Sequence, residues 1–145
     1  MDKKRLLKID LDELCNAMED HSFENEYYLD LETGEILFVS EYMDYEGIDI
    51  ENRIEEEYER FEKIPQTESY EGYRDMEDFI ATIDDQHLID LLEVAIQGKG
   101  AFRRFKDVLL NYPNEEEKWF QFQDDRIVER AREWLDEIGV TLIEE

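Results

Sequence analysis

The pattern of hydrophobic and polar positions is helical near the start of the chain. Leu11, Leu14, Cys15 and Met18 fall at positions i, i+3, i+4 and i+7, and Asp10 stands before them as a side chain able to cap a helix. The opposite face of this segment is acidic. The pattern therefore predicts a short amphipathic helix that buries Cys15 as a small hydrophobic side chain.

A different pattern follows in two β-prone runs, at residues 27–31 and 35–39. A turn joins them, and its Gly34 can take the positive φ that a tight hairpin requires. Side chains alternate between the two faces of such a ribbon. We therefore expect a β-hairpin with one side apolar enough to pack against helices.

Apolar residues return at helical spacing through most of the remaining chain. Asn114 is expected to cap the last helix, because three glutamates follow it in the first turn. Extended segments are expected near Lys63, as a candidate third strand, and at residues 140–143. The expected helices span 50–61, 74–83, 85–96, 100–110 and a stretch from residue 114, which is one helix of six or seven turns or two helices with a bend near 123–125.

Together these elements predict an α+β fold. A small antiparallel sheet, built from the hairpin with the C-terminal strand as a candidate member, is covered by five or six helices. No Pro/Gly/Ser-rich linker, low-complexity tract or repeat divides the chain. Residues 1–145 are therefore expected to form a single acidic domain.

Charge is the least ordinary feature of the composition. The 145 residues include 42 acidic and 16 basic side chains, which give a net charge of −26, while hydrophobic residues still make up 41%. Such a field repels free nucleic acid and anionic membranes and favours basic partners or cations. We therefore expect no direct nucleic-acid binding and no membrane binding. Two basic islands, at residues 1–9 and 98–107, interrupt the acidic surface.

Cysteine and metal chemistry find little support in the sequence. Cys15 is the only cysteine, so we expect no internal disulfide and no zinc site, and a cytoplasmic location fits a chain without a signal sequence. The acidic clusters at 44–49 and 84–90 do not follow the ligand order of a calcium loop. Asp84 or Asp85 is better explained as a helix cap. We expect no metal and no cofactor.

The basic island at 98–107 is the most informative segment for function. It places several cations at the start of a helix whose other face is aromatic. Glycine-opened helix starts with arginines can hold phosphate or carboxylate groups. In the structural alternative, which we favour for the two arginines, Arg103 and Arg104 pair with carboxylates of this same chain.

Aromatic residues add a second candidate contact region. The run from Trp119 to Phe122 carries rings on more than one face of a helix, so at least one ring is expected near a surface. It serves either as a stacking platform or, as we favour, as part of the core. The residues expected to contact a ligand or partner are Gly98, Gly100, Phe102, Arg103, Arg104, Lys106, Trp119 and Phe120.

The segment from Gly100 to Asp107 also carries a resemblance. The chain resembles a bacterial group known as uncharacterised protein family 158, and the octapeptide GAFRRFKD is the specific mark. The resemblance implies an identity and a bacterial setting, but no mechanism. Its weaker marks are Tyr28-Leu29-Asp30, Thr33-Gly34-Glu35, Ile64-Pro65, Met76, Phe79-Ile80, Trp119-Phe120, Phe122 and Trp134-Leu135.

Three functional hypotheses follow. In the first, the protein is a non-catalytic interaction module that contacts a protein or an anionic ligand through residues 98–106. In the second, its acidic surface imitates nucleic acid and occupies a basic protein groove. In the third, it is a small hydrolase or transferase that uses carboxylates, with the arginines holding an anionic substrate. No catalytic spacing is present, so we favour the non-catalytic hypothesis.

Overall fold

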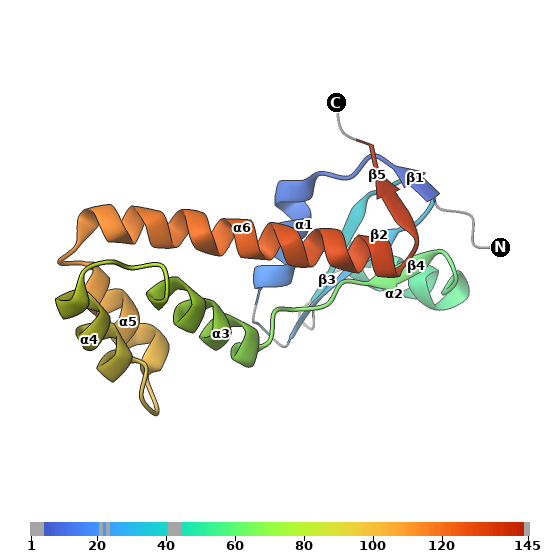
Figure 1. Ribbon diagram of the computed structural model, residues 1–145. Coiled ribbons are helices and arrows are strands. Elements are labelled where there is room, and N and C mark those ends of the chain that lie inside the picture. The colour runs from blue at the N-terminus through green and yellow to red at the C-terminus, as the bar shows by residue number, and fades with distance from the viewer. Residues whose placement is uncertain (1–4, 21, 23, 41–44, 144–145) are drawn as a thin grey trace. The chain divides into compact units, whose positions relative to one another are not determined.

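The computed structural model describes residues 5–20, 22, 24–40 and 45–143. It confirms the predicted α+β class, with helices and two small sheets (Figure 1). The elements of the described chain are β1 (Arg5–Leu7), α1 (Leu11–Glu19), β2 (Asn25–Asp30), β3 (Ile36–Ser40), α2 (Tyr45–Glu56), β4 (Phe61–Lys63), α3 (Ser69–Ile80), α4 (Gln86–Ala95), α5 (Ala101–Leu109), α6 (Pro113–Glu137) and β5 (Val140–Leu142).

These elements form two compact units. Unit 1 comprises residues 1–67 and 127–145, and unit 2 comprises residues 68–126. The division falls inside α6, which is one continuous helix as the first sequence alternative expected. Whether the whole chain behaves as a single domain stays a prediction.

The main sheet of unit 1 is antiparallel, with the strand order β3-β2-β4. The predicted hairpin is confirmed, and the N–H of Gly34, with a φ of 80°, donates to the carbonyl of Asp30 at 2.8 Å. The predicted third strand near Lys63 is confirmed as β4. The helix expected over 50–61 is wrong at its C-terminal end, because Phe61 pairs with β2 as a buried strand residue after a turn.

Both faces of this sheet are apolar, whereas the sequence predicts one. In the observed register Tyr28 lies opposite Leu37, so these two side chains share a face of the sheet. Leu29 follows Tyr28 in the strand and therefore points to the other face. Leu29 belongs to the main core of unit 1. Leu37 and Phe61 are buried on the other face, where the guanidinium of Arg53 in α2 lies 5.8 Å from the Phe61 ring centre. Helix α2 therefore covers the second face.

The main core of unit 1 lies between α1, the C-terminal part of α6 and the hairpin. Leu14, Leu29 and Ala131 are completely buried there, and Cys15 is buried on the apolar face of α1 as predicted. The Asp10 cap is confirmed, since its carboxylate accepts from the N–H of Glu13 at 3.1 Å. The predicted C-terminal strand also forms, but it pairs in parallel with β1 and does not join the hairpin.

Unit 2 is helical and is built around a cluster of aromatic rings. Phe105 and Trp119 pack edge to face with ring centres 4.8 Å apart, and Phe79 contacts Trp119 at 5.3 Å. The predicted Asn114 cap is wrong: α6 begins at Pro113, whose fixed φ suits the first helical position, so Asn114 lies inside the first turn. None of the described helices combines the length and the apolar character that spanning a bilayer requires.

Two glycine substitutions, one a test and one a control, measure how closely the hairpin turn packs. In Gly34→Ala the new Cβ would lie 2.3 Å from the backbone carbonyl oxygen of Lys8, and the residue would also keep its positive φ. We expect a loss of about 3 kcal/mol in the free energy of unfolding, measured by urea denaturation. Gly139→Ala is the control, because Gly139 has a φ of 77° with nothing within 4 Å of its Cβ position. Its expected loss is about 1 kcal/mol, and equal losses would contradict the close packing.

Candidate functional site

The basic segment of the sequence forms the connection from α4 to α5 in unit 2. Helix α4 ends at Ala95, and two glycines with positive φ, Gly98 at 72° and Gly100 at 80°, turn the chain into α5. Left-handed backbone of this kind favours glycine at both positions. The glycines therefore shape a loop; they do not match a phosphate-binding fingerprint.

Arg104 holds this loop together. Its Nε donates to the carbonyl of Ala95 at 2.8 Å, and its two terminal nitrogens donate to the carbonyls of Lys99 and Gln97. The expected pairing of Arg104 with carboxylates is therefore replaced by a contact with backbone oxygens at the negative end of α4. A Cβ on Gly100 would lie only 2.9 Å from the Arg104 guanidinium, so glycine leaves the space that this contact needs.

The neighbouring cations lie on the surface instead. The Arg103 side chain is 89% exposed, and its contact with Asp107 is a long one at 4.0 Å. Phe102, Lys106 and Leu110 follow at intervals of four along α5, and all three are exposed. We refer to Phe102, Arg103, Lys106 and Leu110 as the α5 stripe.

The two aromatic candidates on α6 separate. Trp119 is 4% exposed and belongs to the aromatic core of unit 2, so it presents no ring to a partner. Phe120 is 51% exposed, which confirms the expectation that one ring of this run lies at a surface.

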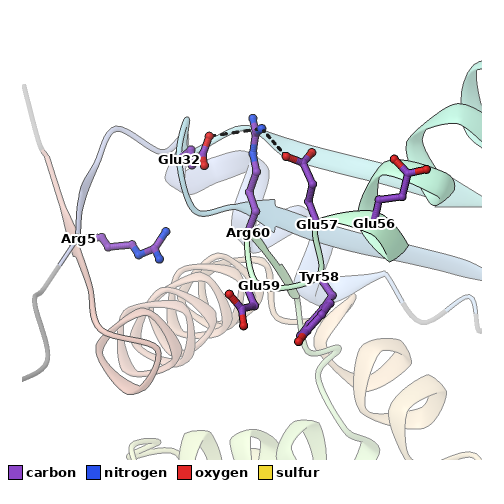
Figure 2. Close-up of a pocket in the computed structure, with 7 residues that line it drawn as sticks. All are labelled: Arg5, Glu32, Glu56, Glu57, Tyr58, Glu59 and Arg60. Atoms are coloured by element: carbon purple, nitrogen blue, oxygen red, sulfur yellow. Dashed lines mark ion pairs between the residues drawn. The ribbon is translucent and has the colours of Figure 1, made fainter.

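Unit 1 contains an open surface pocket, called the cavity below, that the sequence did not reveal. It lies at the C-terminal end of α2 and along the following turn, and its volume is about 340 Å³. Figure 2 shows the carboxylates of Glu32 and Glu57 on either side of the Arg60 guanidinium. The lining residues are Arg5, Glu32, Glu56, Glu57, Tyr58, Glu59 and Arg60.

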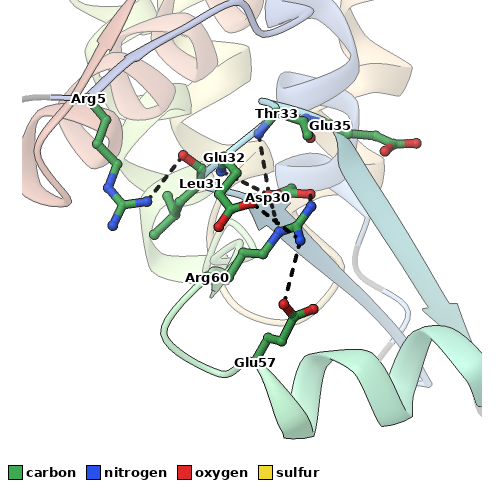
Figure 3. Close-up of polar contacts among 8 residues, drawn as sticks. All are labelled: Arg5, Asp30, Leu31, Glu32, Thr33, Glu35, Glu57 and Arg60. Carbon is green, nitrogen blue, oxygen red and sulfur yellow. Dashed lines mark hydrogen bonds and ion pairs between the residues drawn. The ribbon is translucent and has the colours of Figure 1, made fainter.

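A buried ion pair lies beside the cavity (Figure 3). Arg60 donates from Nε to Oδ1 of Asp30 at 2.9 Å and from Nη2 to Oδ2 at 2.8 Å, and the Asp30 side chain is 3% exposed. Oδ1 also accepts from the N–H of Glu32 at 2.9 Å. Glu32 and Glu57 approach Nη1 of Arg60 at 3.3 and 3.7 Å. One guanidinium thus binds three carboxylates.

This environment changes the ionisation of both partners. Burial raises the pKa of Asp30, but the hydrogen bonds from Arg60 and from the Glu32 N–H outweigh it and lower the pKa to about 2. The hydrogen bonds from Arg60 to Asp30 raise the pKa of Arg60. No spacing rule connects two residues thirty positions apart, so sequence reasoning had no signal for this pair.

The other candidate residues have structural places or lie outside the described chain. Asp85 caps α4 as expected, accepting from the N–H of His87 at 3.0 Å. The acidic cluster at 44–49 falls largely outside the residues whose side chains are described. Across the part of the chain that the structure covers, no three His, Cys, Asp or Glu side chains are arranged to hold a metal ion.

Two adjacent arginines provide a direct test of the loop. Arg104→Gln removes charged hydrogen bonds to backbone carbonyls, and we expect it to lower the free energy of unfolding by about 2 kcal/mol. Arg103→Gln is the matched control, because it makes the same charge change on an exposed side chain. We expect it to lower the free energy of unfolding by about 0.5 kcal/mol or less. Urea denaturation of both variants measures the difference, and equal stabilities would contradict the role of Arg104.

Acid titration tests the Asp30 contact. A folded pKa near 2, against about 4 in the unfolded chain, contributes about 2 kcal/mol above pH 4, and about half of this is lost by pH 3. The stability difference between pH 6 and pH 3 should therefore shrink by about 1 kcal/mol in Asp30→Asn. Asp12→Asn, which makes the same charge change on an exposed side chain, is the control. If the stability of Asp30→Asn depended on pH as that of the wild type does, Asp30 would not be the source of this pH dependence.

Comparison with known proteins places the chain in a family. The profile of the uncharacterised protein family UPF0158 matches residues 4–145. The UPF0158 protein PA5073 of Pseudomonas aeruginosa is 31% identical over 133 residues, which cover 92% of this chain and 84% of that protein.

Chlamydial relatives are longer. UPF0158 proteins of Chlamydia trachomatis and Chlamydia pneumoniae are 32% and 33% identical over 129 residues, which cover 84% of this chain and 38% of theirs. No solved structure matches the chain significantly. The match over nearly the whole sequence, together with the relative from Pseudomonas, shows that the chain belongs to the uncharacterised protein family UPF0158.

Proposed function

We propose that the protein is a non-catalytic interaction module that binds a partner protein through the α5 stripe. The observation that carries the proposal is the 89% exposure of the Arg103 side chain, next to exposed Lys106, on a chain with a net charge of −26. Phe102 and Leu110 add apolar surface, being 45% and 65% exposed. A stripe that combines cations with apolar side chains suits a protein segment that is both acidic and apolar.

The remaining charge of the chain sets a condition on this partner. Long-range repulsion from a net charge of −26 disfavours a strongly acidic protein. This repulsion is screened beyond about 8 Å at physiological salt, whereas direct contacts with the stripe are not. A partner with a small acidic patch on an otherwise neutral or basic surface therefore fits best.

A small anionic ligand is a weaker match for the same site. The guanidinium of Arg104 is occupied by three backbone carbonyls, which leaves Lys99, Arg103 and Lys106 as the nearby cations. All three side chains are exposed, and a small ligand is poorly enclosed on such a surface. The contact geometry therefore favours a macromolecular partner. A cytoplasmic setting for this binding agrees with a single, buried cysteine.

Unit 1 favours a second candidate, the acidic mimic of nucleic acid. Its residues, 1–67 and 127–145, include 27 acidic and 9 basic side chains, whereas unit 2 has 15 and 7. The acidic excess is thus concentrated in one compact unit, as imitation of a phosphate array requires. Binding of this kind weakens steeply with salt and does not depend on the α5 stripe.

The experiment is an affinity capture from nuclease-treated bacterial lysate at low and moderate salt. Arg103→Glu/Lys106→Glu should lose a partner that the wild type keeps at moderate salt, because the cations of the stripe are reversed. Arg74→Glu/Lys118→Glu makes the same charge change on exposed residues of α3 and α6 and should retain that partner.

The outcomes separate the two candidates. A partner kept by both variants at moderate salt contradicts binding through the stripe. A partner kept by both variants and shed by salt supports the acidic mimic instead. Circular dichroism of each variant confirms that it is folded before the comparison is made.

A further inference from the structure

The cavity belongs to unit 1, whereas the α5 stripe belongs to unit 2, and its lining carries an unbalanced charge. Arg5 and Arg60 supply two positive groups among its lining residues. Four glutamates line it and Asp30 adjoins it through Arg60, so five carboxylates stand against two guanidinium groups. The C-terminal end of α2, with its partial negative charge, opens into the same space. The electrostatics favour a cation.

The cavity also has a fixed wall. Arg60 is held by Asp30 on both oxygens, so its side chain cannot swing across the opening without breaking a buried bidentate contact. Arg60 in turn holds the carboxylates of Glu32 and Glu57 at the rim (Figure 2). Within the described residues, Glu56 and Glu59 have no ion-pair partner. These two glutamates are exposed and are therefore accessible to a cation.

Tyr58 gives the cavity an aromatic side. Its side chain is 70% exposed, which makes it one of the most exposed large hydrophobic residues of the described chain. It stands in the turn between α2 and β4, among the glutamates of the lining. A ring beside carboxylates attracts a flat or extended cation through its face while the carboxylates accept hydrogen bonds.

We propose that this cavity binds one basic side chain, an arginine or a lysine, on an exposed segment of a partner protein. A volume of about 340 Å³ is near the lower end of the range for ligand sites and suits one long side chain. Arginine matches the donor set best, because its planar guanidinium can stack on Tyr58 and donate to two carboxylates together. Since the cavity and the stripe lie in different units, this proposal does not depend on the proposed function.

The test uses a small probe so that the overall charge of the protein does not dominate. The probe is the capped tripeptide acetyl-Gly-Arg-Gly-amide, titrated into the full chain and followed by amide chemical shifts. A matched tripeptide with citrulline in place of arginine keeps the shape and removes the charge. We expect saturable shifts at residues 56–60 with the arginine probe and none with the citrulline probe.

Two variants with equal net charge locate the site. Glu56→Gln/Glu59→Gln removes two carboxylates from the lining. It should lower the affinity for the arginine tripeptide about fivefold. Glu55→Gln/Glu62→Gln removes two exposed carboxylates outside the lining and should change the affinity by less than about twofold. Tyr58→Ala should also lower the affinity for the arginine tripeptide. An amide spectrum like that of the wild type confirms that this variant is folded.

The remaining outcomes would overturn the proposal. Equal weakening by both glutamate pairs would show a diffuse attraction to the acidic surface. Absence of saturable shifts at 56–60 would show that the cavity does not take the side chain. Spermidine binding the same residues more tightly than the tripeptide would assign the cavity to a free polyamine instead of a partner segment.

Discussion

The contact of Arg60 with Asp30 connects parts of unit 1 that lie thirty residues apart. Asp30 ends β2 beside the hairpin turn, and Arg60 ends the turn that leads from α2 into β4. One buried carboxylate therefore fixes the hairpin turn, the entry of the third strand and a wall of the cavity. Removing either partner would leave the other buried charge without its counterpart, which costs more than the pair itself contributes.

Cations are scarce in this chain, and several arginines serve internal contacts. Arg60 binds Asp30, Arg104 binds three carbonyls, and Arg126 donates to Asp75 at 3.0 Å and to Asp78. The planar guanidinium suits such contacts because it donates in several fixed directions. The exposed cations of the α5 stripe differ from these arginines, because the Arg103 side chain is 89% exposed and its contact with Asp107 is long, at 4.0 Å.

Local signals predicted much of the fold. The Asp10 cap, the hairpin around Gly34 and the buried face of α1 follow from spacing within a few residues, and the structure confirms each. The parallel pairing of β5 with β1 depends on contacts across the whole chain, and no short pattern encodes it. The candidate site divides in the same way: the sequence marked Arg103 and Arg104 together, but only three-dimensional contacts show that one is structural and the other exposed.

Each compact unit contains one buried tryptophan. Trp119 lies in the aromatic cluster of unit 2, and Trp134 lies in the core of unit 1 at 9% exposure. These are the two tryptophans of the chain, so each is an intrinsic optical reporter for its own half. Replacing one at a time would separate the emission of the two halves, and the coincidence or offset of their transitions would give the cooperativity between them.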